Sequence, residues 1–247
     1  MSALAGHTAL VTGAGRGIGQ ALAVGLAAQG ARVVLTARSA DQLAETVKLV
    51  GRDDTVTVTA DLGTPQGMED VLRTGAAEAV DILVNNAATV APLGPSQSID
   101  PEEFEAQFRL NVFAVARLTF GLVPQLVASG WGRILNISSG IVANPGAMIG
   151  GNAYVSTKAA LEGHTLNLAT ELAGTGITVN VYRPGTVDTA MQDWIREQDP
   201  SVIGTQIHQR FLDYKASGAL ITPEQSAGYV LSLIGGDQTG QIWSYGV

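Results

Sequence analysis

Short apolar runs rich in β-branched residues alternate along the chain with longer stretches of helical periodicity. This alternation predicts a parallel sheet with helices on both faces, the doubly wound α/β arrangement. Strands are expected at about 7–12, 32–37, 55–60, 81–85, 132–138, 178–183 and 241–244. Helices are expected at about 17–29, 39–50, 65–79, 101–129, 152–174 and 223–234. We therefore expect one domain over residues 1–247, with a sheet of about seven strands.

The longest stretch without a strand signal runs from about residue 188 to 220. It holds Trp194, Phe211 and Tyr214 among many polar residues. Segments of this length in a compact domain are commonly functional. We predict that it forms a substrate lid.

Composition excludes several classes of protein. The 247 residues are 46% hydrophobic, which is enough for one sizeable core, and the net charge of -8 argues against nucleic-acid or anionic membrane surfaces. The absence of cysteine excludes disulfides, thiolate metal sites and cysteine nucleophiles. No metal site is expected, because His7, His164 and His208 are scattered, and a packed or capping role is favoured for His164. Without a leader pattern or an apolar run of spanning length, we expect a cytoplasmic protein with no membrane partner.

A glycine-rich turn follows the first predicted strand and opens the first predicted helix. The segment 12–19 reads T-G-A-G-R-G-I-G and contains Gly13, Gly17 and Gly19. Glycines permit a tight turn and close approach of the main chain to a pyrophosphate, which the amide groups and the helix dipole then stabilise. An ordinary turn is the alternative, but the strand before it and the helix after it favour a dinucleotide site.

The end of the second predicted strand indicates which dinucleotide is bound. Arg38 stands where a carboxylate would bind the ribose 2'-hydroxyl, with Ser39 next to it and Arg16 in the glycine-rich turn. These groups attract a 2'-phosphate, so the sequence predicts NADP(H) rather than NAD(H). The alternative is that Arg38 is a solvated surface charge. Asp61 and Leu62, after the third strand, could contact the adenine, although Asp61 could equally cap the following helix.

Tyr154 and Lys158 lie four residues apart on a predicted helix and therefore share one face. A nearby ammonium favours phenolate over phenol and is expected to lower the phenol pKa toward neutral pH. The pair is a candidate proton donor to a carbonyl oxygen.

Together these motifs resemble the short-chain dehydrogenase/reductase family over essentially the whole chain. The ordered elements are the glycine-rich turn, N-N-A-A at 85–88, L-N-V at 110–112, N-I-S-S at 136–139, Y-V-S-T-K at 154–158 and R-P-G-T-V-D-T at 183–189. The resemblance implies a Rossmann fold and a catalytic tetrad of Asn111, Ser139, Tyr154 and Lys158. In this assignment Tyr154 donates the proton, Ser139 binds the same oxygen, Lys158 also holds the nicotinamide ribose, and Asn111 supports a water that leads to solvent.

The same resemblance implies further contacts to the cofactor. Asn86 and Ala87 are expected against the adenosine half, and Pro184, Gly185, Val187 and Thr189 around the nicotinamide. The full expected cofactor set is Gly13, Arg16, Gly17, Ile18, Gly19, Arg38, Ser39, Asp61, Leu62, Asn86, Ala87, Tyr154, Lys158, Pro184, Gly185, Val187 and Thr189.

The sequence departs from the family pattern in a turn near the cofactor and in a loop on the substrate side. Ala88 replaces a usual glycine, and Ser139 precedes Tyr154 by 15 residues, which indicates a lengthened loop. With this spacing Ser138 remains a competitor for the serine role. Only one of the two serines can serve, because neighbouring residues of a strand point to opposite faces.

The substrate region resembles reductases of the sepiapterin and benzil type. This implies an NADPH-dependent reduction of a ketone or a vicinal dicarbonyl compound to an alcohol. Apolar residues that could line the pocket, or instead pack the lid on the core, are Met148, Ile149, Met191, Trp194 and Phe211. The alternatives are oxidation of a secondary alcohol, steroid or sugar, and NADP sensing without turnover. Apolar helices near 101–129 and 152–174 predict a homodimer or homotetramer.

Overall fold

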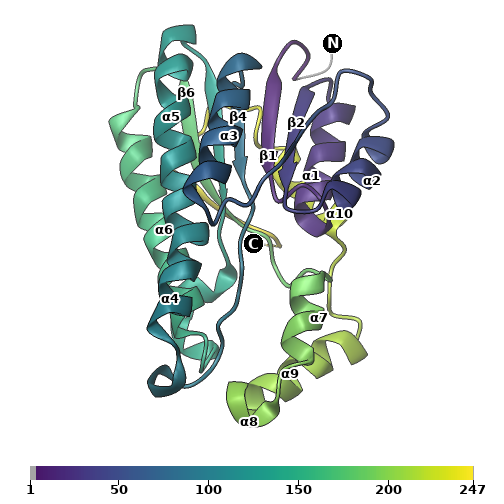
Figure 1. The fold of residues 1–247 in the computed structure, drawn as a ribbon, viewed down its shortest axis with the longest axis vertical. Coiled ribbons are helices and arrows are strands. Elements are labelled where there is room, and N and C mark those ends of the chain that lie inside the picture. Colours follow the sequence, from purple (N-terminus) through teal and green to yellow (C-terminus); the bar gives the residue numbers. More distant parts are fainter. Residues whose placement is uncertain (1–3, 247) are drawn as a thin grey trace.

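Within residues 4–246, the part of the chain that the structure describes, seven strands pair in parallel in the order β3-β2-β1-β4-β5-β6-β7. This computed structural model is a doubly wound α/β fold (Figure 1). The strands are β1 (Thr8–Thr12), β2 (Arg32–Ala37), β3 (Val56–Thr59), β4 (Ile82–Asn85), β5 (Gly132–Ile137), β6 (Ile177–Arg183) and β7 (Ile242–Ser244). All lie within the predicted ranges, apart from Ile177 at the start of β6.

Helices cover both faces of the sheet. The α-helices of the described residues are α1 (Gly17–Ala28), α2 (Ala40–Val50), α3 (Pro65–Ala77), α4 (Pro101–Phe108), α5 (Ala114–Ser129), α6 (Asn152–Glu171), α7 (Ala190–Arg196), α8 (Pro200–Ile203), α9 (Thr205–Ala216) and α10 (Pro223–Leu231). Alternation along β1 divides the core: Val11 packs with α1, α2 and α10, whereas Leu10 points to the other face and packs with α3, α5 and α6. Both faces of β1 are therefore buried, as its continuous apolar run predicts.

The strand order reverses between β1 and β4. Chain connections leave β1 toward β2 on one side, and β4 continues toward β5 on the other. In open α/β sheets this reversal leaves a crevice beyond the carboxyl ends of the strands, where ligands bind. The glycine-rich turn after β1 and Asn86 after β4 both lie at this point.

The helix predicted over 101–129 is interrupted. A π-helical turn, Arg109–Phe113, separates α4 from α5. The wider turn contains Asn111, whose buried side chain bonds to Thr89 and to Thr157 of α6. π-helical turns of this kind are frequent at functional sites, and the helical periodicity of the sequence does not reveal them.

We expected no apolar run long enough to span a membrane. By length and composition, this expectation is wrong for one segment. Pro101–Ser129 contains an 18-residue window of mean hydropathy 1.5, of which 33% is buried in this fold. A single such helix is weak evidence for a membrane, because helices that cover the core of a soluble domain pass the same test. Here α4 packs on α6, and α5 packs on α3 and β5.

Three helices that the sequence pattern did not predict occupy the segment 188–220. Figure 1 shows α7, α8 and α9 gathered at one end of the molecule, apart from the helices that cover the sheet. Their amphipathic signal is weak, because α8 has four residues and Ile207 is the buried residue of α9. The segment is closed at its base, where Val187 and Ile221 pair as an isolated parallel bridge. The segment therefore forms a group of helices outside the sheet, with both of its ends held together. Its role as a substrate lid stays a prediction.

Candidate active site

A cavity of about 1780 Å³ lies at the carboxyl ends of the strands and extends to α7 and α9. Most of the predicted site residues line it, although they come from distant parts of the sequence. Those residues are Gly13, Arg16, Gly17, Ile18, Arg38, Ser39, Asp61, Leu62, Asn86, Ala87, Ser139, Tyr154, Lys158, Pro184, Gly185, Val187 and Thr189. The two exceptions, Gly19 and Asn111, lie behind the lining, and both are buried.

The glycine-rich turn has the geometry that its residues require. Gly13 has φ +66° and Gly17 has φ +57°, both in the region that favours glycine. A Cβ on Gly19 would lie 2.2 Å from the main-chain oxygen of Gly13, so a larger residue cannot fit there. The side chain of Arg16 does not cap α1, so it leaves the first amide groups of the helix available. The free N–H groups at the start of α1 can bind the pyrophosphate of a dinucleotide, and the glycines let the main chain approach it closely.

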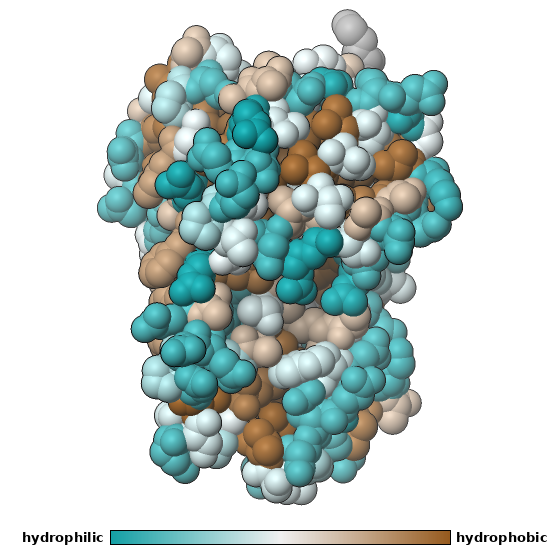
Figure 2. Space-filling view, in the orientation of Figure 1, coloured by the Kyte–Doolittle hydropathy of each residue, from teal (hydrophilic) through white to brown (hydrophobic). Residues whose placement is uncertain are grey.

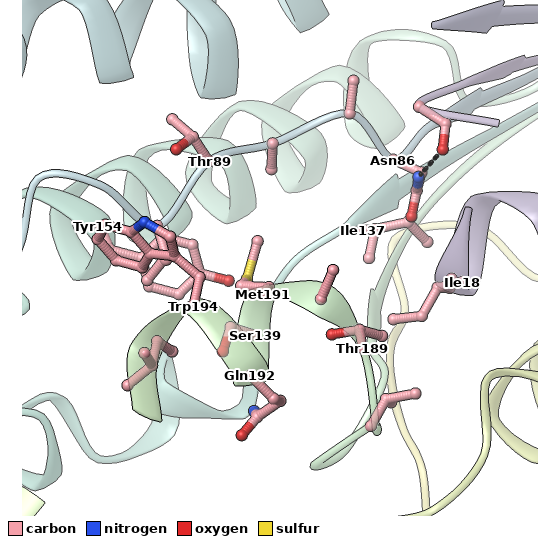
Figure 3. Close-up of a pocket in the computed structure, with 18 of the residues that line it drawn as sticks. Ile18, Asn86, Thr89, Ile137, Ser139, Tyr154, Thr189, Met191, Gln192 and Trp194 are labelled. Carbon is pink, nitrogen blue, oxygen red and sulfur yellow. Dashed lines mark hydrogen bonds between the residues drawn. The ribbon is translucent and has the colours of Figure 1, made fainter. Parts of the chain in front are cut away.

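Asn86 fastens the end of β4 to this turn. Its Nδ2 donates to the main-chain oxygen of Thr12 at 2.9 Å and to that of Gly13 at 3.3 Å. Figure 3 shows one hydrogen bond of Asn86 at this end of the pocket. The hydroxyl of Thr12 accepts from the main-chain N–H groups of Asn86 and Ala87, at 2.9 and 3.0 Å. Thr12 therefore holds the segment after β4 against the glycine-rich turn. Its place at the end of a strand did not reveal this role.

Two arginines stand at the predicted adenosine end of the cavity. Arg16 and Arg38 are exposed, and neither pairs with a carboxylate among the described residues. Ser39 caps α2, its hydroxyl oxygen accepting from the Gln42 N–H at 3.2 Å, which leaves its hydroxyl proton free to donate. Two cations and a donor at one end of the cavity fit a phosphate monoester.

Asp61 does not cap the following helix. Thr64 is the N-cap of α3 and accepts from Gly67 N–H, whereas Asp61 Oδ1 accepts from Gly63 N–H at 2.8 Å. The capping alternative is therefore wrong. Asp61 and Leu62 line the cavity, and their contact with an adenine stays a prediction.

Tyr154 lies at the opposite end of the cavity, on the first turn of α6, and Ser139 follows β5. Figure 3 shows the Tyr154 hydroxyl and Ser139 on the same side of the pocket, close to Met191 and Trp194. Burial raises the pKa of the Tyr154 phenol to about 12, and its hydrogen bond with Ser139 acts in the opposite direction. The expected lowering of the phenol pKa is thus not found, because only 8% of the tyrosine is exposed and burial disfavours the phenolate.

Lys158 is buried one turn further along α6. Its Nζ donates to the main-chain oxygen of Ile137 at 2.7 Å and lies 5.8 Å from the centre of the Tyr154 ring. Burial lowers the pKa of Lys158 to about 8, and Glu162 acts against this shift. The ammonium is therefore close to its titration range at neutral pH.

Asn111 supports α6 through its side chain. Its Nδ2 donates to the main-chain oxygen of Thr89 and to the Thr157 hydroxyl, and its Oδ1 accepts from Thr89 N–H. Both amide hydrogens are thus committed to protein groups. The water contact expected of Asn111 stays a prediction.

The two neighbouring serines have different partners. Ser138 is buried, and its hydroxyl donates to Glu162 at 2.7 Å. The Ser139 oxygen accepts from Ile141 N–H at 3.4 Å, which leaves its proton free to donate beside Tyr154. This geometry favours Ser139 over Ser138 for the catalytic role. Sequence reasoning missed Glu162, although its spacing of four residues from Lys158 on the same helix is a signal for it.

The substrate end of the cavity is partly apolar. Four of the five predicted residues line it, namely Met148, Met191, Trp194 and Phe211. Ile149 does not, since 71% of it is exposed, and this prediction is wrong. The lengthened loop after Ser139 forms two short 3₁₀ turns, Gly140–Ala143 and Pro145–Ala147, after which Met148 packs against Tyr154.

His164, which lies outside this cavity, is a packed residue. Its ring lies edge-on to Phe120 at 5.6 Å between centroids, and burial lowers its pKa. Within residues 4–246 no group of three or more potential ligands is placed to hold a metal ion.

Fold and site together define a dinucleotide-dependent oxidoreductase. A family model for short chain dehydrogenases matches residues 7–200. The chain therefore belongs to the short-chain dehydrogenase/reductase family, and it is an NAD(P)-dependent enzyme that acts on CH–OH and carbonyl groups.

Characterised relatives differ in their substrates. The L-xylulose reductase of Bos taurus is 39% identical over 189 residues, which are 76% of this chain and 75% of the relative. The structure of L-sorbose reductase from Gluconobacter frateurii with NADPH and L-sorbose has a TM-score of 0.86 and 29% identity, covering 99% of this chain and 97% of the other. A 3-ketoacyl-(acyl-carrier-protein) reductase from Brucella melitensis, solved with NADH, has a TM-score of 0.83 and 27% identity, covering 98% and 97%. Similar proteins thus occur with either nicotinamide cofactor.

Proposed function

We propose that this enzyme uses NADPH to reduce a ketone or a vicinal dicarbonyl compound to an alcohol. One observation carries the proposal. The Tyr154 hydroxyl and Ser139 face one end of the cavity that holds two unpaired arginines, Arg16 and Arg38, at its other end. The two hydroxyl groups can bind the carbonyl oxygen of a substrate, and the two arginines can bind the 2'-phosphate of NADPH.

The chain's own residues handle the oxygen and the proton. When bound, the nicotinamide supplies the hydride that reaches the carbonyl carbon. Ser139 donates a hydrogen bond to the carbonyl oxygen, where negative charge develops. Tyr154 transfers its proton to the same oxygen, so the product is a neutral alcohol and the tyrosine becomes a phenolate. The positive charge of Lys158 stabilises that phenolate until it regains a proton.

The raised pKa of Tyr154 keeps the residue in the protonated form from which reduction starts. A phenol with a pKa of about 12 keeps its proton at neutral pH and is ready to donate it. Oxidation of an alcohol requires the phenolate as a base, and burial disfavours that form. Reduction therefore starts from the form of Tyr154 that is present at neutral pH, and the panel assay below decides the preferred direction.

The lining of the substrate end supports a carbonyl compound that also carries polar groups. Met191 and Trp194 offer apolar surface, and Gln192 lies next to them in the cavity (Figure 3). The amide group of Gln192 can hydrogen-bond a polar substituent of the substrate. The related ketose reductases have names that agree with this chemistry.

A panel assay tests the proposal. Ketoses, diketones, simple ketones and the corresponding secondary alcohols are incubated with NADPH, NADH, NADP⁺ and NAD⁺, and nicotinamide absorbance is followed. We expect the highest kcat/KM with NADPH and a hydroxyketone or a dicarbonyl compound. A clear preference for alcohols with NAD⁺ would identify the dehydrogenase alternative, and binding without turnover of any compound would identify a sensor.

We also propose a symmetric homodimer or homotetramer. Support comes from α5, whose outer face presents Phe120, 60% exposed, and Val127, 44% exposed; the π-helical turn just before it presents Phe113, 58% exposed. Figure 2 shows hydrophobic residues, in brown, among the polar ones on one face of the molecule. Large exposed aromatic side chains along one helix are typical of an interface between copies.

A further inference from the structure

A buried carboxylate lies beneath the catalytic lysine. Glu162 follows Lys158 by one helical turn on α6, and only 6% of it is exposed. Both of its oxygens are bound: Arg183 donates from Nε to Oε1 at 2.9 Å and from an Nη to Oε2 at 2.7 Å, and Ser138 donates to Oε1 at 2.7 Å. Three elements thus meet at one carboxylate, because Ser138 follows β5 and Arg183 ends β6.

Burying the charged Glu162–Arg183 pair costs folding free energy, because both groups lose their contact with water. A buried ion pair seldom stabilises a fold more than apolar residues of similar size would, so its presence points to another role. Here the pair has a third charge one turn away, the ammonium of Lys158. The carboxylate attracts that ammonium, whereas the guanidinium of Arg183 offsets part of the attraction.

We propose that Glu162, held by Arg183 and Ser138, is a positioning residue that keeps the ammonium of Lys158 charged where it lies, bonded to Ile137 and near Tyr154. Ser138 and Arg183 orient the carboxylate, and Arg183 limits how strongly it attracts Lys158. The inference rests on the proposed function, in which the charge of Lys158 stabilises the Tyr154 phenolate. It adds a layer of residues that act through Lys158 and do not touch substrate.

Among the groups around Lys158, Glu162 is the negative charge that favours its protonated form. Burial lowers the pKa of Lys158, and Glu162 raises it. On its own helix Lys158 also faces Tyr154, and β5 presents the oxygen of Ile137. The π-helical turn reaches α6 through the neutral Asn111, which bonds to Thr157, and its charged residue, Arg109, is exposed. Helix α4 also packs on α6, and its carboxylates, Glu102, Glu103 and Glu105, are exposed.

The proposal predicts shifts of opposite sign for the two partners. Glu162→Gln removes the carboxylate and leaves Arg183 as a neighbouring cation, so Lys158 should titrate at lower pH, by roughly 1 pH unit. Arg183→Met removes the competing cation, so Lys158 should titrate at higher pH. If the Glu162–Arg183 pair served only the stability of the fold, both variants would be less stable, and the titration of Lys158 would not shift in opposite directions.

NMR can follow this titration directly, because the chain has three lysines, Lys48, Lys158 and Lys215. Protein labelled with ¹³C at the lysine ε-carbon is titrated, and Lys158→Met assigns the resonance. The control is Glu171→Gln, which removes an exposed carboxylate from the same helix. If a single variant does not fold, the double variant Glu162→Gln, Arg183→Met removes both charges of the pair together, and Lys158 should still titrate below the wild type in it.

The expected result is a downward shift in Glu162→Gln, an upward shift in Arg183→Met and no shift in Glu171→Gln. The proposal is overturned if Lys158 titrates at the same pH in Glu162→Gln and Glu171→Gln. Because the readout needs no substrate, the shifts can appear even if no ketone is reduced, in which case the proposed function fails alone. If ketones are reduced and Lys158 does not shift, this inference fails alone.

Discussion

Lys158 donates a hydrogen bond of 2.7 Å to the main-chain oxygen of Ile137, the last residue of β5. The bond joins the helix that carries Tyr154 to the strand that leads into Ser139. The two hydroxyl groups that we propose bind the substrate oxygen, those of Tyr154 and Ser139, are thus fixed relative to each other by an ammonium that is itself buried. Proton donation and the placement of Lys158 are therefore coupled.

The first prediction concerns the alkaline limb of the pH profile. Burial lowers the pKa of Lys158 from 10.5 to about 8, so its charge is present below that pH and is lost as pH rises through it. Tyr154, with a pKa of about 12, keeps its proton over the same range. The rate of carbonyl reduction should therefore fall above about pH 8. Steady-state kcat/KM measured from neutral to alkaline pH checks this, and a rate that stays level to about pH 10, near the ordinary lysine value, would contradict it.

The second prediction concerns cofactor choice. Arg38→Asp replaces a cation that faces the predicted 2'-phosphate with a repelling carboxylate. The KM for NADPH should rise roughly 10- to 100-fold, the equivalent of about 1.5–3 kcal/mol for a charge-assisted hydrogen bond, and the KM for NADH should change little.

Arg73→Asp, an exposed charge reversal on α3, is the matched control for Arg38→Asp and should leave both KM values unchanged. Equal effects of Arg38→Asp on the two cofactors would show that Arg38 is a solvated surface charge.

The third prediction separates the glycine-rich turn from ordinary helical glycines. Gly19→Ala places a methyl group 2.2 Å from the Gly13 oxygen, so the turn must open and dinucleotide binding should be lost. Gly228→Ala on α10 meets nothing within 4 Å and should stabilise the helix by up to about 1 kcal/mol. Calorimetric binding of NADPH and thermal unfolding measure both variants. Normal binding by Gly19→Ala would mean that the turn does not hold the pyrophosphate.

The sequence predicts the sheet well, for a physical reason. Strands buried on both faces are short and continuously apolar, as Leu10 and Val11 in β1 show, and such runs stand out between longer helical patterns. The glycines and the spacing of Tyr154 and Lys158 are equally local signals. Nearly all predicted site residues therefore meet in one cavity.

What the sequence did not reveal depends on three-dimensional context. The pKa of Tyr154 is set by the depth of its burial, and a spacing of four residues from a lysine cannot indicate that depth. The π-helical turn at Asn111 follows from partners in Thr89 and Thr157, both remote in sequence. Ile149 and Met148 are neighbours of similar hydrophobicity, yet one is exposed and the other packs on Tyr154. Each of these outcomes is decided by packing between distant segments.

The fourth prediction concerns assembly. Phe120→Glu places a charge at the centre of the exposed apolar face of α5, which should separate the subunits into monomers of 25.5 kDa. Light scattering after size-exclusion chromatography measures the mass. Leu49→Glu, which changes an exposed leucine on α2, is the control and should keep the wild-type mass. A monomeric wild-type protein would contradict the proposed assembly.

The most direct test of the central claim is the rate of ketone reduction by Tyr154→Phe with NADPH. The variant lacks the hydroxyl that donates the proton, while the ring and its packing remain. We predict that kcat falls roughly 10²- to 10⁴-fold, the usual contribution of a general acid, with little change in NADPH affinity. Tyr229→Phe, a partly buried tyrosine on α10, should retain full activity. Reduction by Tyr154→Phe at nearly the wild-type rate would contradict proton donation by Tyr154.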